Sequence, residues 1–309
     1  MHRLFCVLIL AWSLSLRAVQ PVQILYNDWT SQQVLSHIVA DIFTELGYQT
    51  EFIEAKTDGQ WFLLKAGMAD VQVEVWEGTM ADKYAQLMQS QIIVDLGDYA
   101  LKTREDWWYP LYVKQHCPGL PHWEALIQCA EVFARPGSQG KGVYIAGPWE
   151  KPDRARIRAL KLPFVVEQVD SGEALWKKLA IAHKIKQPIL MFNWTPNWVG
   201  AVYPGEFVEF PDFDERCETE PSWGVNPKFL FDCGNPKSGW LKKVASTLFV
   251  EQHPCLAEGL RQFNMTGATL EQLAAMVNLE NFTPSLVAKH WLENNQVRWR
   301  KWFVSCLRA

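Results

Sequence analysis

The stretch that decides the fold is QILYNDWTSQQVLSHIVADIFTELGY, residues 23–48. It begins with a short apolar run that predicts a strand. Thr30 and Gln33 have the spacing of a helix capping box, and Gly47 is typical of a helix end. Between them, apolar residues recur at helical spacing: Val34, Leu35, Ile38, Val39, Ile42, Phe43 and Leu46. The stretch therefore predicts a strand, a tight turn and a helix, with Trp29 in the turn.

The next segments continue this alternation. Residues 51–54 predict a second strand, and residues 58–66 predict a helix. Val71, Val73 and Val75 then alternate as a third strand, and Thr79 starts another helix. The order β-α-β-α-β implies an α/β unit with a mostly parallel sheet and helices on its faces.

A second α/β unit follows an aromatic and proline-rich segment at residues 106–121. Its expected strands and helices are, in order, the strand 141–146, the helix 152–160, the strand 164–169, the helix 171–184 and the strand 188–192. After residue 207 come an irregular acidic loop and a helical tail without strands of its own. We expect that tail to cover the first unit, which gives a discontinuous first lobe at 21–110 and 208–309 and an inserted second lobe at 111–207.

Residues 1–20 have the composition of a secretory signal peptide. A basic residue near the start precedes an apolar run, and Arg17-Ala18 follows it. The run is too short to span a bilayer, although a retained membrane anchor is the alternative interpretation. Removing Arg3 and Arg17, the charged residues of this segment, changes the net charge from −4 to −6. An acidic chain without a basic run argues against a nucleic-acid partner and favours a small ligand.

Six cysteines remain after the signal segment, an even number in the oxidising compartment that such a segment implies. Six cysteines allow 15 pairings, so the connectivity stays open. The closest pairs in sequence are Cys117 with Cys129 and Cys217 with Cys233, and each would close one irregular loop. Cys255 and Cys306 would then form the remaining pair. Zinc-like spacing of Cys and His is absent from the sequence.

Four tryptophans stand at the ends of predicted strands: Trp29, Trp76, Trp149 and Trp194. In open α/β sheets, ligands bind beyond the carboxyl ends of the strands, and two of these residues fall in each lobe. If the lobes face each other, the four rings converge on one cleft. Each has an alternative role: Trp29 as a hydrophobic staple on its helix, Trp76 and Trp194 as strand core, and Trp149 as a ring that covers a loop.

Several indoles around one cleft suit a quaternary ammonium group. Its methyl surface carries positive charge, and the negative faces of tryptophan attract it by about 0.5–2 kcal/mol per ring. A carboxylate nearby would complete the site, and Glu77, Glu131 and Glu150 are candidates, each with solvated surface charge as the alternative. The other tryptophans favour core or hinge packing: Trp107, Trp108, Trp198, Trp240, Trp291, Trp299 and Trp302.

The runs NDWTSQQVLSHIVADIFTELGY, DVQVEVWEG, SGEALW and FNWTPNWV resemble the extracytoplasmic solute-binding proteins of ABC uptake systems for glycine betaine, choline and related methylated amines. The resemblance implies a two-lobed periplasmic-binding fold of type II, a periplasmic or secreted monomer, and delivery of the ligand to a membrane permease with its ATPase. It implies no catalysis and no required cofactor. Trp29, Trp76 and Trp194 match the aromatic-box positions best, and Trp223, Trp176, Trp123 and Trp149 are further candidate walls.

The sequence departs from this family in three places. Choline-preferring relatives tend to carry an acid two residues after the first box tryptophan, where this chain has Ser31, so choline is disfavoured. No Arg or Lys was recognised beside a cage tryptophan, so backbone amides would have to hold a betaine carboxylate. Trimethylamine N-oxide, a smaller ligand, is then a further candidate. The insertion between Cys217 and Cys233 is not general to the family, and its neighbourhood offers four oxygen donors for a Ca²⁺-like ion: Asp212, Asp214, Glu218 and Asp232.

Two other functions fit parts of the pattern. Tryptophan also stacks on sugars, so a secreted carbohydrate-binding or glycoside-active protein is an alternative, but the sequence identifies no pair of catalytic carboxylates. A sensory module of the same fold is the third possibility. Sequence motifs for a nucleophile elbow or a phosphate loop are absent.

Overall fold

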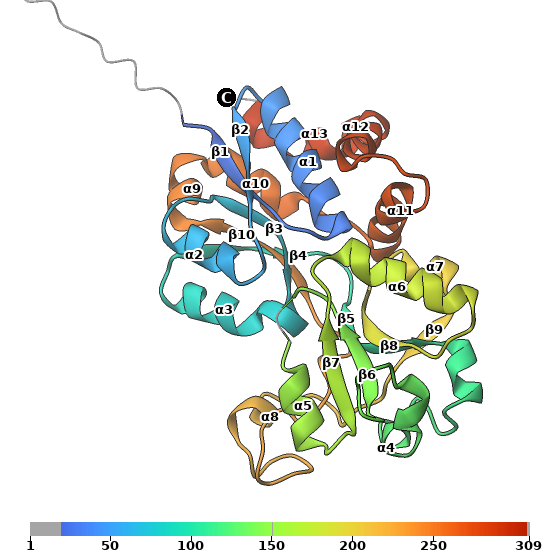
Figure 1. The fold of residues 1–309 in the computed structure, drawn as a ribbon. Helices are drawn as coiled ribbons and strands as arrows, with labels where there is room; N and C mark the ends of the chain where they lie inside the picture. Colours follow the sequence, from blue (N-terminus) through green and yellow to red (C-terminus); the bar gives the residue numbers. More distant parts are fainter. Residues whose placement is uncertain (1–19, 150, 308–309) are drawn as a thin grey trace, which may run out of the picture.

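The computed structural model describes residues 20–149 and 151–307, and these form two lobes, each around a five-stranded sheet (Figure 1). The predicted signal peptide lies outside the described residues except for its last position. The first sheet has the order β2 (Thr50–Glu54), β1 (Val22–Tyr26), β3 (Val71–Trp76), β10 (Leu241–Ser246) and β4 (Ile93–Asp98). The second has the order β7 (Phe164–Gln168), β6 (Gly142–Ala146), β8 (Leu190–Thr195), β5 (Arg104–Pro110) and β9 (Gly205–Phe207).

Helices cover both sheets. Those of the first lobe are α1 (Thr30–Glu45), α2 (Gly59–Lys65), α3 (Glu77–Gln89), α9 (Thr247–Gln252), α10 (Pro254–Gln262), α11 (Gly267–Asn278), α12 (Pro284–Asn294), α13 (Gln296–Trp302) and α14 (Val304–Leu307). In the second lobe and its loops lie η1 (Leu111–Gln115), α4 (Ala125–Cys129), η2 (Ala130–Phe133), α5 (Asp153–Ala159), α6 (Gly172–Lys184), α7 (Val199–Val202) and α8 (Arg216–Thr219). The C-terminal helices α11 and α12 pack against α1 of the first lobe (Figure 1).

Each sheet is mixed, with one strand that runs against the others. β10 pairs antiparallel with β3 and β4, and β5 pairs antiparallel with β8 and β9. The prediction that the tail has no strand was wrong, because β10 lies inside the first sheet. β4, β5 and β9 were also missed, since their sequences lack a clean alternation of apolar and polar residues.

Two short segments connect the lobes, one before β5 and one before β10. They pair with each other through Thr103 and Gly239, whose backbone N–H groups each donate to the other's carbonyl at 2.9 Å. Because β5 belongs to the second sheet, that sheet begins at Arg104, before the expected boundary at residue 111. The loop around α8 lies beside α5 of the second lobe (Figure 1), although its residues fall in the range expected for the first lobe.

Helix α1 follows the predicted pattern, with one correction at its start. Val34, Leu35, Ile38, Val39, Ile42 and Phe43 are fully buried, and burial of each such side chain contributes roughly 1.5–3 kcal/mol. Gly47 has φ of 89° and ends the helix, because glycine adopts this conformation without a steric penalty. The capping box was wrong: the N-cap residue is Trp29, not Thr30.

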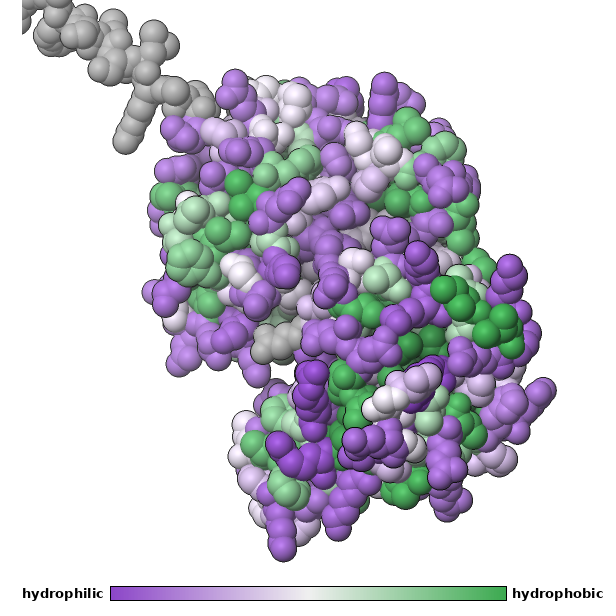
Figure 2. Space-filling view, viewed as in Figure 1, coloured by the Kyte–Doolittle hydropathy of each residue, from purple (hydrophilic) through white to green (hydrophobic). Residues whose placement is uncertain are grey.

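Three disulfides close loops and join helices, and they have the connectivity that the spacing favoured: Cys117–Cys129, Cys217–Cys233 and Cys255–Cys306. The visible outer surface is mainly hydrophilic, with apolar side chains gathered chiefly over the second lobe (Figure 2). In the described part of the chain, no helix has both the length and the apolar character that crossing a bilayer requires.

A buried arginine holds the disulfide loop on the second lobe. Arg156 of α5 donates from Nε to the Cys233 carbonyl at 2.8 Å, from Nη1 to Asp106 at 3.0 Å and from Nη2 to Asn235 at 2.7 Å. Arg156 and Asp106 are both 2% exposed. Removal of the arginine would leave the carboxylate buried and without its charge partner.

We therefore expect Arg156→Ala to lower the free energy of unfolding by about 3–5 kcal/mol, measured by urea denaturation. Arg154→Ala, on an exposed position of the same helix, is the matched control and should change it by less than about 0.5 kcal/mol. Equal effects of the two substitutions would contradict the structural role of Arg156.

Candidate functional site

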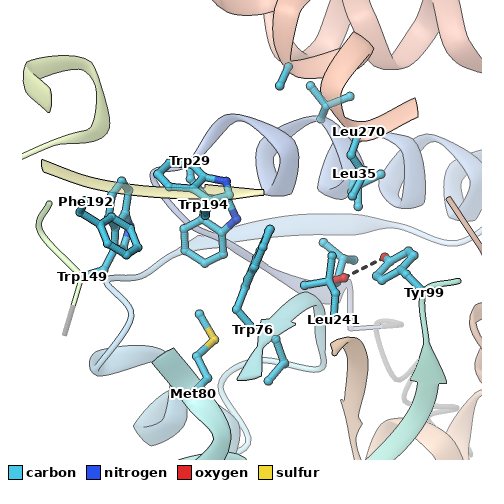
Figure 3. Packing of buried hydrophobic residues seen from close by; sticks show 14 of the residues in the cluster. Trp29, Leu35, Trp76, Met80, Tyr99, Trp149, Phe192, Trp194, Leu241 and Leu270 are labelled. Carbon is cyan, nitrogen blue, oxygen red and sulfur yellow. Dashed lines mark hydrogen bonds between the residues drawn. The ribbon is translucent and has the colours of Figure 1, made fainter. Parts of the chain in front are cut away.

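The four strand-end tryptophans meet around one cavity between the lobes (Figure 3). Its volume is about 30 Å³, and one side of it is open to solvent. Its lining residues are Trp29, Trp76, Thr79, Met80, Glu105, Trp149, Phe192 and Trp194. This volume is far below the roughly 300–1,000 Å³ common for ligand pockets, so the walls stand close together and would have to separate to admit a ligand larger than water.

Both lobes contribute aromatic walls. Trp29 and Trp76 come from the first lobe, one just after β1 and the other at the end of β3. On the second lobe, the ring centroid of Trp194 lies 5.0 Å from Trp149 and 5.7 Å from Phe192. All four tryptophans are at least 92% buried, the most exposed being Trp194 at 8%. The cavity is thus faced by indole surfaces from both lobes, between which the backbone crosses in the two connecting segments.

A fully buried carboxylate holds the two first-lobe indoles. Glu74 Oε2 accepts hydrogen bonds from Trp29 Nε1 at 2.6 Å, Trp76 Nε1 at 3.0 Å and Ser31 Oγ at 3.0 Å. Burial raises the pKa of Glu74 to about 7, although these three donors act in the opposite direction. Among the described residues, Glu74 Oε1 has no hydrogen-bond partner.

A second acid, Glu105, lies on the opposite side of the cavity at the start of β5. Its Oε1 accepts from Lys151 Nζ at 3.0 Å and from the Thr79 hydroxyl. The Lys151 and Glu105 side chains are only 5% and 6% exposed, so this pair is largely withdrawn from water. Lys151 Nζ also lies 5.1 Å from the Phe192 ring centroid. An acid and a base therefore stand next to the aromatic walls.

Polar contacts join the lobes at the rim of the cavity. Trp149 Nε1 of the second lobe donates to Asp28 Oδ1 of the first at 2.9 Å. Lys151 Nζ donates to the Gly78 carbonyl at 2.9 Å, and Thr79 donates to Glu105. The side of Gly78 faces Glu105, since a Cβ there would stand 2.7 Å from Glu105 Oε2. These contacts hold the two lobes together around the cavity.

Sequence reasoning missed Thr79, Met80, Glu105 and Phe192 as lining residues, along with Glu74 and Lys151 behind them. Glu105 and Lys151 were hard to find because each depends on an unrecognised strand or loop. Lys151 did have a signal, its position two residues after Trp149. Phe192 and Trp194 alternate on β8 and so face the same side, a pattern that could have been used.

The remaining candidates lie elsewhere. Trp176 of α6 stands behind Trp194, with ring centroids 5.1 Å apart. Trp223 lies in the disulfide loop under Arg216, and Trp123 lines a different surface hollow. Glu131 is exposed on η2. Glu77 accepts from the Trp240 backbone N–H at 3.0 Å, and Glu150 is outside the described residues.

The proposed calcium ligands are not gathered around one point. Asp212 pairs with Lys237 at 2.7 Å, Asp214 pairs with Arg216 at 2.9 Å, and Asp232 accepts from the Asn226 backbone N–H. Glu218 lines the hollow between α3 and the disulfide loop. Across residues 20–149 and 151–307, no group of three or more His, Cys, Asp or Glu is arranged to hold a metal. The calcium hypothesis rested only on the number of acidic residues in this part of the sequence. In the structure, two of these carboxylates, Asp212 and Asp214, form ion pairs with Lys237 and Arg216.

Comparison with known proteins explains the arrangement. Residues 20–294 match the model of the family described as the substrate binding domain of ABC-type glycine betaine transport system. The chain belongs to this family. It is a substrate-binding component of an ABC transport system of the glycine betaine, choline or trimethylamine N-oxide type, not an enzyme, and its family requires no cofactor. The glycoside-active alternative is therefore excluded.

Individual relatives are consistent with this assignment. The chain is 31% identical over 290 residues to a trimethylamine N-oxide-binding protein of Pelagibacter ubique (strain HTCC1062), covering 91% of this chain and 90% of that protein. Its fold is similar to that of a choline binding protein in complex with choline, with TM-score 0.74, 14% identity and 92% of each chain covered. Lactococcal OpuAC in its closed glycine betaine complex gives TM-score 0.69 at 19% identity, over 92% of this chain and 99% of that one. These structures confirm the two-lobed periplasmic-binding fold.

The raised pKa of Glu74 links this substrate-binding protein's stability to pH. The folded protein holds the Glu74 proton up to about pH 7, whereas the unfolded chain loses it near its ordinary value of 4.5. The folded state therefore binds more protons between these values, and stability falls as the pH rises through that window. We expect the free energy of unfolding to decline by about 3 kcal/mol more in the wild type than in Glu74→Gln between pH 4 and pH 8. Urea denaturation at a series of pH values measures this, and parallel curves for the two proteins would contradict it.

Proposed function

We propose that this protein captures a small methylated ammonium compound in a tryptophan cage and delivers it to an ABC permease and its ATPase. Trp29 and Trp76 would form the walls on one lobe, and Trp149, Trp194 and Phe192 the walls on the other. The single observation that carries the proposal is the convergence of four indoles from both lobes on one cavity. A cation with a methyl surface is the ligand class that gains most from several aromatic faces at once.

The cavity's size and charges favour trimethylamine N-oxide within this class. The cavity holds only about 30 Å³, so the smallest member of the class needs the least separation of the walls. Glu105 offers negative charge toward the ammonium group, while the Lys151 ammonium beside it can donate to an anionic oxygen. Ser31 donates its hydroxyl to Glu74 and leaves no acid at that position for a choline hydroxyl. The relative from Pelagibacter ubique supports the same choice.

Capture would proceed by closure of the lobes. The ligand enters an open cleft, and the lobes rotate about the paired segments at Thr103 and Gly239. The Trp149 bond to Asp28 and the Lys151 bond to the Gly78 carbonyl then form across the rim. We propose that the protein acts in the periplasm as a monomer, because the described part of one chain supplies every wall of the cavity.

Calorimetric titration with trimethylamine N-oxide, glycine betaine, choline and carnitine tests the proposal. We expect the tightest binding for trimethylamine N-oxide, with a change in tryptophan emission on binding because four indoles line the site. Absence of binding for all four compounds would refute the proposed function.

Substitution of cage walls tests the role of the indoles. Loss of one ring removes about 0.5–2 kcal/mol of cation–π attraction, so Trp194→Ala should raise the Kd roughly 2- to 30-fold or more. Trp223→Ala, in the disulfide loop and away from the cavity lining, is the matched control and should leave the Kd unchanged. If both variants bind like the wild type, the cage is not the binding site.

A further inference from the structure

Glu74 is the centre of the wall that the first lobe contributes. It lies on β3, the middle strand of the first sheet, and is fully buried. One of its oxygens accepts from both Trp29 Nε1 and Trp76 Nε1, at 2.6 and 3.0 Å. One indole follows β1 and the other ends β3, so this oxygen is the point at which they are joined.

The shared acceptor fixes the direction of both ring faces. An indole N–H lies at the ring edge and donates in the ring plane, so a bond to a fixed oxygen limits rotation of the ring about its side-chain torsions. Both tryptophans stand at the N-cap position of a helix, α1 or α3, and extend from that turn toward the same carboxylate. Without the acceptor, each buried N–H would lose its hydrogen-bond partner, and the orientation of each ring would no longer be restrained by that bond.

A neutral side chain could accept two indole N–H bonds at lower cost. A buried carboxylate is expensive unless its charge is balanced, and Glu74 Oε1 has no hydrogen-bond partner in the described chain. A trimethylammonium group in the cage would provide part of that balance, because it would lie against the faces of the two indoles whose edges bond to the carboxylate. The N–H bonds to a carboxylate are also stronger than bonds to a neutral acceptor.

We infer that Glu74 is the positioning and specificity-determining residue of the cage: it orients Trp29 and Trp76 and makes the site select a ligand with a positively charged trimethylammonium group over one of the same shape without that charge. This inference rests on the proposed function and deepens it. Glu74 acts through the two indoles and does not line the cavity itself.

Few other charged groups face this part of the sheet. The pKa of the buried Tyr99 is raised by burial and by the charge of Glu74. Lys243 of β10 lies 4.2 Å from the Tyr99 ring centroid, and burial lowers its pKa to about 8. Glu105 and Lys151 stand on the cavity side. These four groups are all retained when Glu74 alone is replaced. A change in the pH dependence of binding after that replacement can therefore be assigned to the titration of Glu74.

Two substitutions separate the roles of charge and reach. Glu74→Gln keeps a side-chain oxygen at the same reach but removes the charge, whereas Glu74→Asp keeps the charge but shortens the reach. We expect each substitution to raise the Kd for trimethylamine N-oxide roughly 10-fold in calorimetry. For tert-butanol, a compound of similar shape without a charged group, Glu74→Gln should change the Kd less than 2-fold. Ser31→Ala removes one donor to the same oxygen but leaves both indole bonds, so its effect should stay below about 3-fold. Glu131→Gln, at an exposed acid, is the matched control.

The pH profile distinguishes this role from a purely structural one. Because the Glu74 pKa lies near 7, wild-type affinity for trimethylamine N-oxide should rise between pH 6 and pH 8 as the carboxylate ionises. Glu74→Asp should retain a pH response, and Glu74→Gln should lose it. In the wild-type protein labelled at the indole nitrogens, the Trp29 and Trp76 N–H resonances should shift together over the same pH range.

The outcomes separate this inference from the function on which it rests. If the wild type binds none of the methylated ammonium compounds, the proposed function is wrong and the role of Glu74 falls with it. If the wild type binds but Glu74→Gln has the same affinity and pH profile, only the role of Glu74 is refuted, and a persistent pH response belongs to another group such as Lys243. Should both Glu74 variants fail to fold, independent movement of the two indole resonances in the wild type would still overturn it.

Discussion

The bonds from Trp29 and Trp76 to one oxygen of Glu74 connect the first turn of the chain to the centre of its sheet. Around this contact, β3 carries a line of buried polar side chains. Gln72 donates to Asn27 at 2.7 Å, and Gln32 of α1 donates to the carbonyl of Leu25 at 2.8 Å. A buried polar network of this kind stabilises only a single arrangement, because any displacement leaves groups unpaired. The position of the first-lobe walls is therefore set by the interior of the sheet and not by flexible loops.

The second lobe presents its walls in a different way. Trp149 and Trp194 pack against each other and against Phe192, and Trp176 supports Trp194 from behind. Packing of ring on ring fixes orientation without a buried charge. Glu105, the buried acid that lines the cavity on this side, is paired with Lys151 and with Thr79 of the opposite lobe. The cavity thus has one wall held by a carboxylate and one held by aromatic contacts, and the two walls meet across bonds that exist only when the lobes are together.

The sequence predicted the parts of this arrangement that depend on local pattern. The helix α1, the α/β alternation and the position of four tryptophans at strand ends follow from periodicity, and convergence of those ends is a property of such sheets. Glu74 was not found because the run VQVEVW reads as an alternating strand with its acid toward water, whereas β3 is covered on both faces. Glu105 was missed because β5 is rich in charged and aromatic residues, a pattern more typical of a connecting segment than of a strand. The burial of Glu74 and the position of Glu105 both depend on pairing between strands that are distant in sequence. A single sequence carries little information about such pairing.

Tryptophan stands at the N-cap of both α1 and α3, where it makes no side-chain capping bond and so stabilises the helix less than a usual N-cap residue. Ser, Thr, Asp or Asn at that position stabilises a helix by about 1 kcal/mol through a bond to its first turn, and an indole gives this up. A helix start is also where unpaired N–H groups create positive potential, an unfavourable neighbour for a cation. The carboxylate beneath the two rings opposes that potential. Placing large aromatic residues at two helix starts is therefore compatible with a cationic ligand because the same sheet supplies a buried negative charge behind them.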